Sequence, residues 1–276
     1  MSFFRRAGAE ILRLIERASD ANPATLNAAI YAKREAGVTQ IFAQASDRIV
    51  YQMTPIGVIN PTSISFSFDD FLGNELSTIA VTAGGTNGFG MAMGSNHPGT
   101  ITSSVTAVGD ATRISVGGNS NQSIYFGGGQ ADFESMHQIP VLSNGVNNVV
   151  VRDGYGDSAN LDYTDGVWLE YDLAVNGSQN YFLCTANAGV RNRVDTGRIA
   201  VAGANRKLTM RVNAAGTLVT AAIDGVASAN SLALTIPVTA ARVTQISLQT
   251  TKQAGAGAMS VFRDYYWHRQ TFTVPR

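Results

Sequence analysis

The chain has 276 residues and a formal net charge of zero, and only 14% of its residues are charged. Such a neutral chain lacks the basic surface that nucleic-acid binding requires, and its 45% hydrophobic content excludes intrinsic disorder. Because Cys184 is the only cysteine, no intrachain disulfide can form, and stability must come from the core or from oligomerisation. We expect Cys184 to be a small buried hydrophobic residue.

The first predicted element is an amphipathic helix from Phe3 to Ala18, in a region of residues 1–22 that ends before Pro23. Charges interrupt this segment, so it lacks the apolar region of a secretory signal, and acidic residues break the basic face of a membrane-surface helix. No apolar run in the sequence approaches the roughly 20 residues that cross a bilayer. We therefore expect synthesis in a cytoplasm without export and no membrane insertion. The apolar stripe must pack against its own domain, a symmetry mate or a neighbouring protein.

Residues 23–61 are predicted to form a small β collar and a linker. Short strands at 29–33, 38–43 and 48–53 are too few to enclose a core, so pairing between chains would supply the missing apolar partners. The series closes on Met53-Thr54-Pro55 and resembles a small module near the N-termini of tailed-phage fibre and appendage proteins, which implies a homotrimer. The residues expected to mediate oligomerisation and attachment to other virion proteins are Phe4, Ile11, Leu14, Ile15, Tyr31, Ile41, Phe42, Ile49 and Tyr51.

Beyond the linker, apolar and polar residues alternate with a period of two in short segments, which is typical of strands with one buried face. Glycine-rich stretches separate the segments. None ends in Gly-Lys-Ser/Thr before a helix, so we read them as turns and not as phosphate-binding loops. The strands predicted in this half are Ile64–Phe68, Ile79–Ala83, Gly88–Gly94, Ile124–Phe126 and Phe133–Ile139.

The segment from Val141 to Thr164 is rich in Asn, Asp and Gly and is predicted to be loop. It superficially resembles calcium loops but lacks their regular acidic spacing, so binding of a single Ca²⁺ by loop oxygens stays open. His97, His137 and His268 are far apart in sequence, without the spacing of a zinc site. No metal site and no cofactor are predicted.

Asp-Gly and Asn-rich turns separate the alternating segments of the C-terminal half, and these turns favour antiparallel hairpins. We also expect a hairpin at Gly255–Gly257 before the last strand. In that strand, either Tyr265 and Trp267, or Phe262, Tyr266 and His268, would fill the core. The strands predicted in this half are Asp165–Leu173, Leu208–Asn213, Val219–Ile223, Leu232–Pro237, Val243–Thr250 and Met259–Thr273.

Several of these segments carry a family resemblance through their order and spacing. They are Asn96–Gly99, Thr112–Val116, Trp168–Asp172, Val194–Gly197, Arg211–Thr217 and Ile223–Gly225. In this order they resemble the concanavalin A-like (laminin G-type) jelly-roll domain of many tailed-phage fibre and appendage proteins. The likeness covers roughly residues 84–268, and it implies a mainly β protein with an antiparallel jelly-roll β-sandwich.

Retaining glucanases of this fold carry Glu-x-Asp-x-Glu on one strand, which places carboxylates at alternate positions on one face. This chain has Glu170 and Asp172, but Ala174 stands where the third carboxylate belongs. Without that general acid the leaving oxygen has no positioned proton donor. We therefore expect that the protein is not an enzyme and has no catalytic residues.

The parity of the same strand suggests a different role. If Val167, Leu169 and neighbours of like parity face the core, then Trp168, Glu170 and Asp172 share the opposite face. An exposed tryptophan beside two acceptors would suit sugar stacking, so these three residues are the candidate carbohydrate site. They would equally suit a subunit interface or a covering layer.

The sequence thus predicts three parts: a helix at 1–22, a β collar and linker at 23–61, and a jelly-roll β-sandwich at 62–276. The predicted function is that of a trimeric surface appendage of a bacteriophage virion, which displays a lectin-like domain for adhesion to a host glycan or for particle decoration. The alternatives are a capsid cement protein without a ligand and a polysaccharide-degrading glycoside hydrolase.

Overall fold

The structure is a computed structural model that describes residues 16–17, 28–35, 38–45, 50–52, 64–69, 79–90, 99–115, 124–157, 162–238 and 244–274. The chain divides into two compact units, Met1–Pro61 and Thr62–Arg276. No helix in these described stretches is long and apolar enough to span a membrane.

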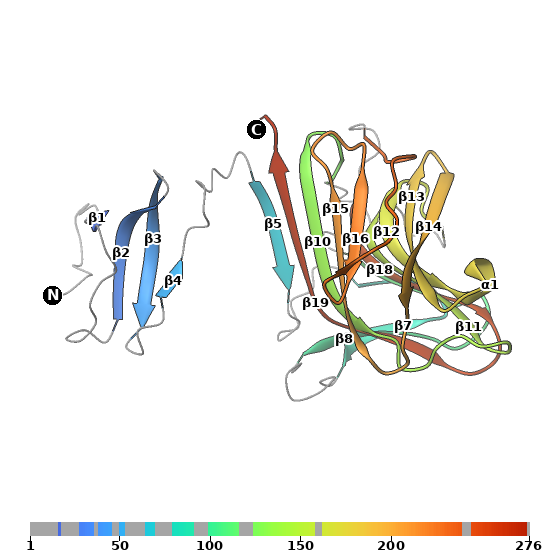
Figure 1. Cartoon of the computed structure of the whole chain (residues 1–276). Helices are drawn as coiled ribbons and strands as arrows, with labels where there is room; N and C mark the ends of the chain where they lie inside the picture. The colour runs from blue at the N-terminus through green and yellow to red at the C-terminus, as the bar shows by residue number, and fades with distance from the viewer. Residues whose placement is uncertain are drawn as a thin grey trace. The chain divides into compact units, whose positions relative to one another are not determined.

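The first unit contains a four-stranded sheet in the order β1-β2-β3-β4 (Figure 1). Strands β2 (Ala28–Glu35), β3 (Val38–Ala45) and β4 (Val50–Gln52) pair antiparallel and confirm the three strands predicted here. The predicted helix lies outside the described residues except at its end, where Glu16–Arg17 form β1 and pair parallel with β2. The helical prediction was wrong for these two residues, because pairing with β2 gives their backbone hydrogen-bond partners.

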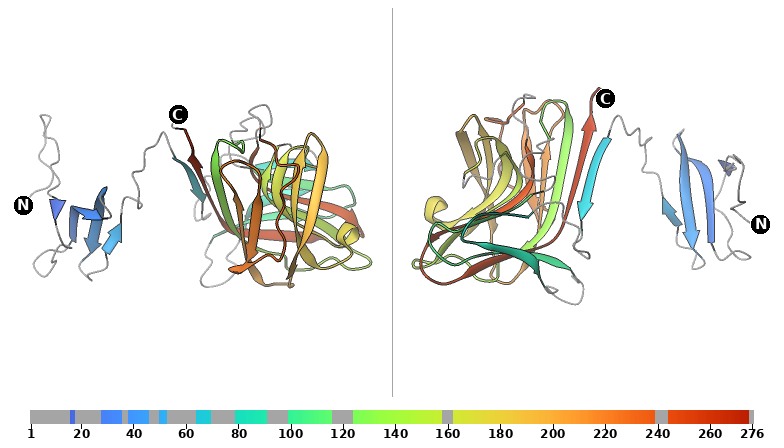
Figure 2. Two further views of the ribbon diagram at one scale, coloured as in Figure 1. Left: turned by 45° about the horizontal axis from the view of Figure 1, so that its top comes forward. Right: turned by 180° about the vertical axis from the view of Figure 1, so that it is seen from behind.

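The second unit is a sandwich of two sheets whose strand pairings are all antiparallel (Figure 2). This arrangement confirms the predicted mainly β sandwich. The first sheet, called the β10 sheet, has the order β17-β16-β15-β10-β19-β8-β7, and β5 also pairs with β19. Its strands are β5 (Ile64–Asp69), β7 (Thr86–Gly90), β8 (Thr100–Val105), β10 (Gly129–Gln138), β15 (Asn205–Val212), β16 (Val219–Ile223), β17 (Val226–Ala227) and β19 (Met259–Phe272).

The second sheet, called the β11 sheet, has the order β14-β13-β12-β11-β18-β9-β6. A single short helix, α1 (Leu173–Asn176), follows β12 within the described residues. The strands of this sheet are β6 (Ile79–Ala83), β9 (Ala111–Ser115), β11 (Asn148–Gly156), β12 (Gly166–Asp172), β13 (Asn180–Asn187), β14 (Val190–Ile199) and β18 (Gln245–Ala254).

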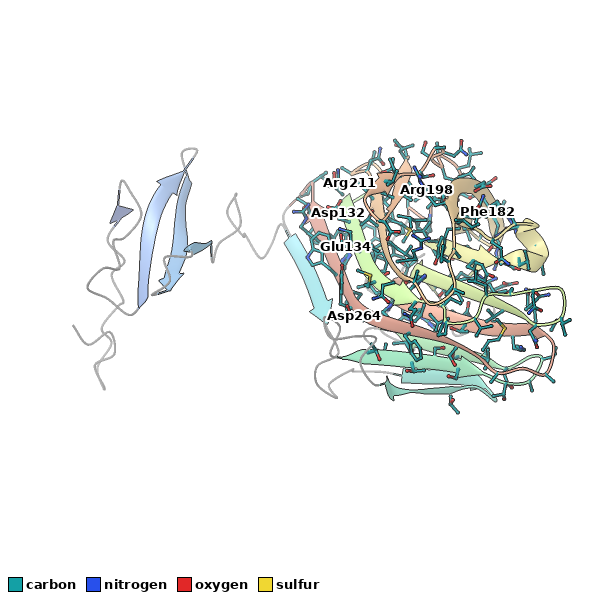
Figure 3. All side chains as sticks on the ribbon, turned by 60° about the horizontal axis from the view of Figure 1, so that its bottom comes forward. Asp132, Glu134, Phe182, Arg198, Arg211 and Asp264 are labelled. Carbon is teal, nitrogen blue, oxygen red and sulfur yellow. The ribbon has the colours of Figure 1, made fainter. Side chains whose placement is uncertain are left out.

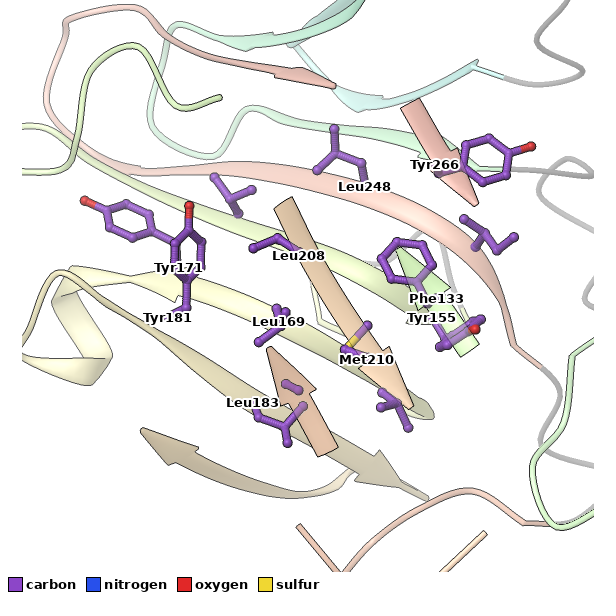
Figure 4. Close-up of a cluster of buried hydrophobic side chains, with 14 of the residues drawn as sticks. Phe133, Tyr155, Leu169, Tyr171, Tyr181, Leu183, Leu208, Met210, Leu248 and Tyr266 are labelled. Carbon is purple, nitrogen blue, oxygen red and sulfur yellow. The ribbon is translucent and has the colours of Figure 1, made fainter. Parts of the chain in front are cut away.

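The core lies between the two sheets and is filled by alternate residues of their strands (Figure 4). Phe133 of β10 and Met210 of β15 face Leu169 of β12 and Tyr155 of β11 across this space, and all four side chains are buried. Burial of apolar surface at roughly 25 cal/mol per Å² makes this layer the main source of stability.

A buried polar network crosses the middle of this apolar core. Asp153 of β11 is fully buried and pairs with the guanidinium of Arg263, which is 1% exposed and belongs to the opposite sheet. Ser135 donates to the same carboxylate at 2.8 Å, and the His137 ring lies 3.1 Å from it. Burial alone would raise the pKa of Asp153, but the charge of Arg263 and the hydrogen bond from His137 lower it. The carboxylate is therefore ionised and holds the two sheets together.

Strand β11 overturns the loop predicted from Val141 to Thr164. Its Asp and Gly residues look like turn formers, yet β11 is flanked by β12 and β18. Asp153 is tolerated there because Arg263 neutralises it. Gly154 has φ +150°, and a Cβ at this position would lie 2.5 Å from Cε of Met210 and 2.7 Å from the carbonyl oxygen of Val167. Close packing, and not a turn, requires this glycine.

Two other predicted strands and one hairpin also differ from the structure. Ile124 makes only an isolated bridge with Thr244, and Leu232 makes only one with Val219, so no strand forms at 124–126 or 232–237. The predicted hairpin at 255–257 does not form, because the chain there connects β18 of one sheet to β19 of the other and these two strands do not pair. Strand β8, for which the sequence analysis had no prediction, pairs with β19 and β7.

The last strand, β19, changes its inward face at a β-bulge opposite Met136 and His137. Odd-numbered residues point inward before the bulge, and even-numbered residues do so after it, because the extra residue shifts the alternation. Of the predicted set Phe262, Tyr266 and His268, the last two are buried in the core. Phe262 precedes the bulge and is only half-buried.

We predict that Asp153→Ala lowers the free energy of unfolding by about 3–5 kcal/mol, because it leaves the Arg263 charge buried without its partner. The double variant Asp153→Ala/Arg263→Met should cost clearly less than the sum of the two single changes, since the apolar methionine needs no counter-charge. Urea denaturation of the wild-type protein, the two single variants and the double variant measures these free energies of unfolding. If the losses of the two single variants simply add in the double variant, Asp153 and Arg263 do not act as a pair.

Candidate functional site

The outer face of the β10 sheet carries a concentration of charged and aromatic side chains. On β10, Asp132 and Glu134 point outward, while Phe133 between them faces the core. Strand pairing places Arg211 of β15 and Arg269 of β19 on either side of Asp132. Figure 3 shows Asp132, Glu134 and Arg211 together on this part of the sheet.

The two arginines clamp Asp132. Arg211 donates from Nε to Oδ1 at 2.6 Å, and Arg269 donates from Nη2 to Oδ2 at 2.8 Å. Asp132 is only 5% exposed although it lies on the outer face, because these side chains cover it. Burial would raise its pKa, but the hydrogen bonds from Arg269, Arg211 and Gln130 outweigh that effect and lower the pKa. Asp132 is therefore charged at neutral pH and orients the two guanidinium groups.

Glu134 forms a second cluster on the next row of the same face. The Tyr265 hydroxyl donates to Glu134 Oε1 at 2.8 Å, and Lys207 Nζ lies 3.6 Å from Oε2. Burial, together with the bond to Glu134, raises the pKa of Tyr265. The phenol therefore stays protonated and serves as a hydrogen-bond donor at neutral pH.

A groove of about 400 Å³ runs over Asp132 and Glu134. Its walls combine the Arg211 and Arg269 clamp with Trp267, whose ring centroid lies 5.6 Å from Cζ of Arg269. Thr209, Thr220 and small alanine side chains of β15, β16 and β17 complete it. A groove that offers fixed cations, an aromatic ring, hydroxyls and little bulk is suited to a polar ligand with several hydroxyl groups.

Directly beneath this face, the inward side of the same strands holds an uncharged histidine. The Tyr155 hydroxyl lies 2.8 Å from Nδ1 of His268 and donates to the backbone carbonyl of Asp132 at 3.1 Å. Nε2 of His268 is buried and has no hydrogen-bond partner in the described part of the chain. Burial therefore lowers the pKa of His268 to about 4, since a proton on Nε2 would have no acceptor.

The carbohydrate site expected at Trp168, Glu170 and Asp172 is not an exposed platform. The predicted parity holds, because these residues lie outside the core cluster that contains Val167 and Leu169. All three are nevertheless buried, with 1%, 3% and 2% of their surface exposed. The prediction of exposure was wrong because further side chains cover this face of the β11 sheet.

Trp168 is enclosed by two such side chains. The ring of Tyr163 meets it edge-on with centroids 5.1 Å apart, and Cζ of Arg191 lies 5.7 Å from its centroid. Cys184 belongs to the same cluster and is buried, as predicted. Of the roles considered for this tryptophan, the structure supports the covering layer.

The two carboxylates beside Trp168 are also engaged. Glu170 accepts from Nε of Arg152 at 2.8 Å, and Asp172 caps helix α1 by accepting from the backbone N–H of Val175 at 3.1 Å. Ala174 lies within α1, so the strand ends before the position where a third carboxylate would stand. This face therefore lacks the alternating carboxylates of the glucanase arrangement.

The residues expected to mediate oligomerisation are only partly described. Tyr31 lies on β2, Ile41 and Phe42 lie on β3, and Tyr51 lies on β4. Phe4, Ile11, Leu14, Ile15 and Ile49 lie outside the described residues. Within the described ranges, no three His, Cys, Asp or Glu side chains gather closely enough to hold a metal ion.

No protein-family model matches the sequence, and no curated protein is similar to it in sequence. Solved structures do share its fold. A protein of unknown function from Shewanella oneidensis MR-1 aligns with a TM-score of 0.55 at 14% identity, over 81% of this chain and 99% of that chain. Peanut lectin aligns with a TM-score of 0.51 at 9% identity, over 76% and 99% of the two chains. An endo-β-1,4-glucuronan lyase from the fungus Trichoderma reesei aligns with a TM-score of 0.50 at 9% identity, over 73% and 94%.

These comparisons establish a lectin-like, concanavalin-type jelly roll, and they also correct one prediction. We expected a protein without enzymatic activity because a glucanase motif was incomplete. The glucuronan lyase has the same fold and is an enzyme, so the absence of that motif does not exclude catalysis. The prediction that the protein is not an enzyme was therefore wrong, because this fold also occurs in an enzyme that is not a glucanase.

Asp132, Arg211 and Arg269 were not predicted as site residues, and Trp267 was predicted only as part of one of two alternative core sets, which was wrong because it lies on the outer face after the bulge. Outward parity on β10 and β15 is a signal that sequence alone could have supplied for Asp132 and Arg211. The convergence of these residues depends on β15 and β19 flanking β10, although the two strands are distant from it in sequence.

We predict that the wild-type protein loses stability as the pH falls from about 6.5 to 4. His268 binds a proton in the unfolded state below pH 6.5 but in the folded state only below about 4. Unfolding is therefore favoured by acid in this window, by up to about 3 kcal/mol from this residue. In His268→Gln, which keeps a polar group near Tyr155, this part of the pH dependence should disappear. Parallel pH dependences of the two proteins between pH 4 and 6.5, measured by urea denaturation, would contradict the assignment.

Proposed function

We propose that this protein recognises a carbohydrate in the groove on the outer face of the β10 sheet. The observation that carries the proposal is the clamp of Arg211 and Arg269 on Asp132, set beside Trp267 in a groove with hydroxyl-bearing walls. Preorganised donors next to an aromatic ring offer a sugar both hydrogen bonds and apolar contact. The shared fold of a lectin and a glucuronan lyase supports this proposal.

We further propose that the protein is a trimeric surface appendage of a bacteriophage virion, which uses the groove for adhesion to a host glycan. The support for this part is the resemblance of its N-terminal strands and its jelly-roll segments to phage fibre and appendage proteins. In this proposal, residues 1–61 attach the chain to other virion proteins and to its symmetry mates, and residues 62–276 display the groove.

The groove is tested by filling it. We predict that Thr220→Trp abolishes glycan binding, because Thr220 is an exposed strand residue in the groove wall and an indole there would occupy the space of the ligand. The matched control is Thr271→Trp, which adds the same side chain at an exposed position of β19 outside the groove lining. Glycan-array binding of the wild-type and both variant proteins provides the measurement. Equal loss in both variants, or in neither, contradicts the placement of the site.

The same ligand separates binding from cleavage. Incubation of the wild-type protein with a glycan that it binds, followed by assay of released reducing ends, distinguishes a binding module from the glycoside hydrolase alternative. A particle-decoration protein without a ligand would bind no glycan on the array.

For the oligomeric state, we predict that light scattering gives a mass three times the 29.2 kDa of one chain. Phe42→Asp on β3 should lower that mass, because a charge would be buried in the interface between chains. A wild-type mass of one chain at micromolar concentration would contradict the trimer.

A further inference from the structure

The arginine clamp has more hydrogen-bonding capacity than Asp132 uses. A guanidinium group has five N–H donors. Arg211 spends its Nε on Asp132 and, in the described part of the chain, makes no other hydrogen bond, while its side chain is 60% exposed. The Arg269 side chain is 41% exposed and donates through Nη2. Unused N–H groups of these two exposed side chains can therefore reach a ligand, although Nε of Arg269 is buried and has no hydrogen-bond partner among the described residues.

These donors are held in place before any ligand arrives. Asp132 fixes one edge of each guanidinium, and the Trp267 ring packs against Arg269. A side chain that is already ordered loses less conformational entropy when it binds a ligand, so each new hydrogen bond contributes more to affinity. The arginines of the clamp therefore do more than pair with Asp132, because they also hold unused N–H groups in fixed positions.

The arrangement of charges in the groove favours an anion. Among the lining residues, Arg211 and Arg269 balance Asp132 and Glu134, and Lys207, outside the lining, lies 3.6 Å from Glu134 and offsets its charge. Asp132 is buried beneath the arginines, so an anion that enters from outside meets N–H donors before it meets that carboxylate. Two partly exposed guanidinium groups suit one acidic group on a sugar ring better than a nucleic acid, whose binding depends on many phosphate contacts.

We propose that the groove selects a glycan that bears a carboxylate, such as a uronate, and that Arg211 and Arg269 determine this specificity by pairing with it. This inference rests on the proposed function and names the class of sugar for the same site. A planar carboxylate accepts two parallel N–H bonds from one guanidinium, so it exploits the fork geometry that neutral hydroxyls do not.

The experiment compares a uronate oligosaccharide with its methyl ester, which removes the charge and leaves the sugar skeleton unchanged. Titration calorimetry on the full-length protein should show that the acid binds at least tenfold more tightly than the ester. Arg211→Gln and Arg269→Gln should each weaken binding of the acid tenfold or more and weaken binding of the ester less, so that the ratio of acid to ester affinity falls toward one. An unchanged urea denaturation midpoint would show that each variant is folded.

The matched control is Arg206→Gln on the same strand, β15. Arg206 pairs with Asp224 outside the groove, so its loss should leave binding of both ligands unchanged. Equal affinity of the wild-type protein for acid and ester, with both lost in Thr220→Trp, would overturn the acidic specificity and leave carbohydrate recognition standing. Binding of neutral glycans alone would likewise overturn the acidic specificity and leave carbohydrate recognition standing.

A third ligand distinguishes the kind of anion. A sulfated oligosaccharide without carboxylates should bind at least tenfold more weakly than the uronate. Equal or tighter binding of the sulfated sugar would overturn the assignment of a carboxylate. Absence of binding to every glycan would instead contradict the proposed function itself, and the inference would fall with it.

Discussion

A buried ion pair joins the two sheets of the sandwich inside its apolar core. Asp153 of β11 and Arg263 of β19 meet in the core, and Ser135 and His137 complete the hydrogen bonds of the carboxylate. A charge in an apolar core is tolerated only with such partners, because an unpaired buried ion costs several kcal/mol. Because Asp153 of β11 needs these partners, β10 and β19 of one sheet are held in position opposite β11 of the other sheet.

Once β10 and β19 are fixed from the inside, their outward residues are fixed as well. Asp132 alternates with Phe133, and Arg269 follows His268, so the packing of the inner side chains sets the spacing of the clamp. The Tyr155 hydroxyl binds the carbonyl of Asp132 and supports this position from below. The groove is therefore a rigid surface on a sheet, which suits recognition because its donors are already oriented.

The two faces of the sandwich treat similar residues in opposite ways. On the β11 sheet, Trp168 and Glu170 are covered by Tyr163 and Arg191 and engaged by Arg152, so they stabilise a closed layer. On the β10 sheet, Trp267 and its arginine partner remain partly exposed beside a groove. The same fold carries a lectin and a polysaccharide lyase, so the site, and not the fold, must decide between binding and catalysis.

The sequence by itself determined the fold class, most strands and the parity of β12, because a period of two reflects a local property of the backbone. It failed at β11, where Asp153 looks like a turn residue until Arg263 neutralises it from the other sheet, and at β19, where a bulge exchanges the faces. It also missed the clamp of Asp132, Arg211 and Arg269. Only the tertiary structure decided these features, since strand neighbours and the cover over each face depend on contacts between residues far apart in the chain.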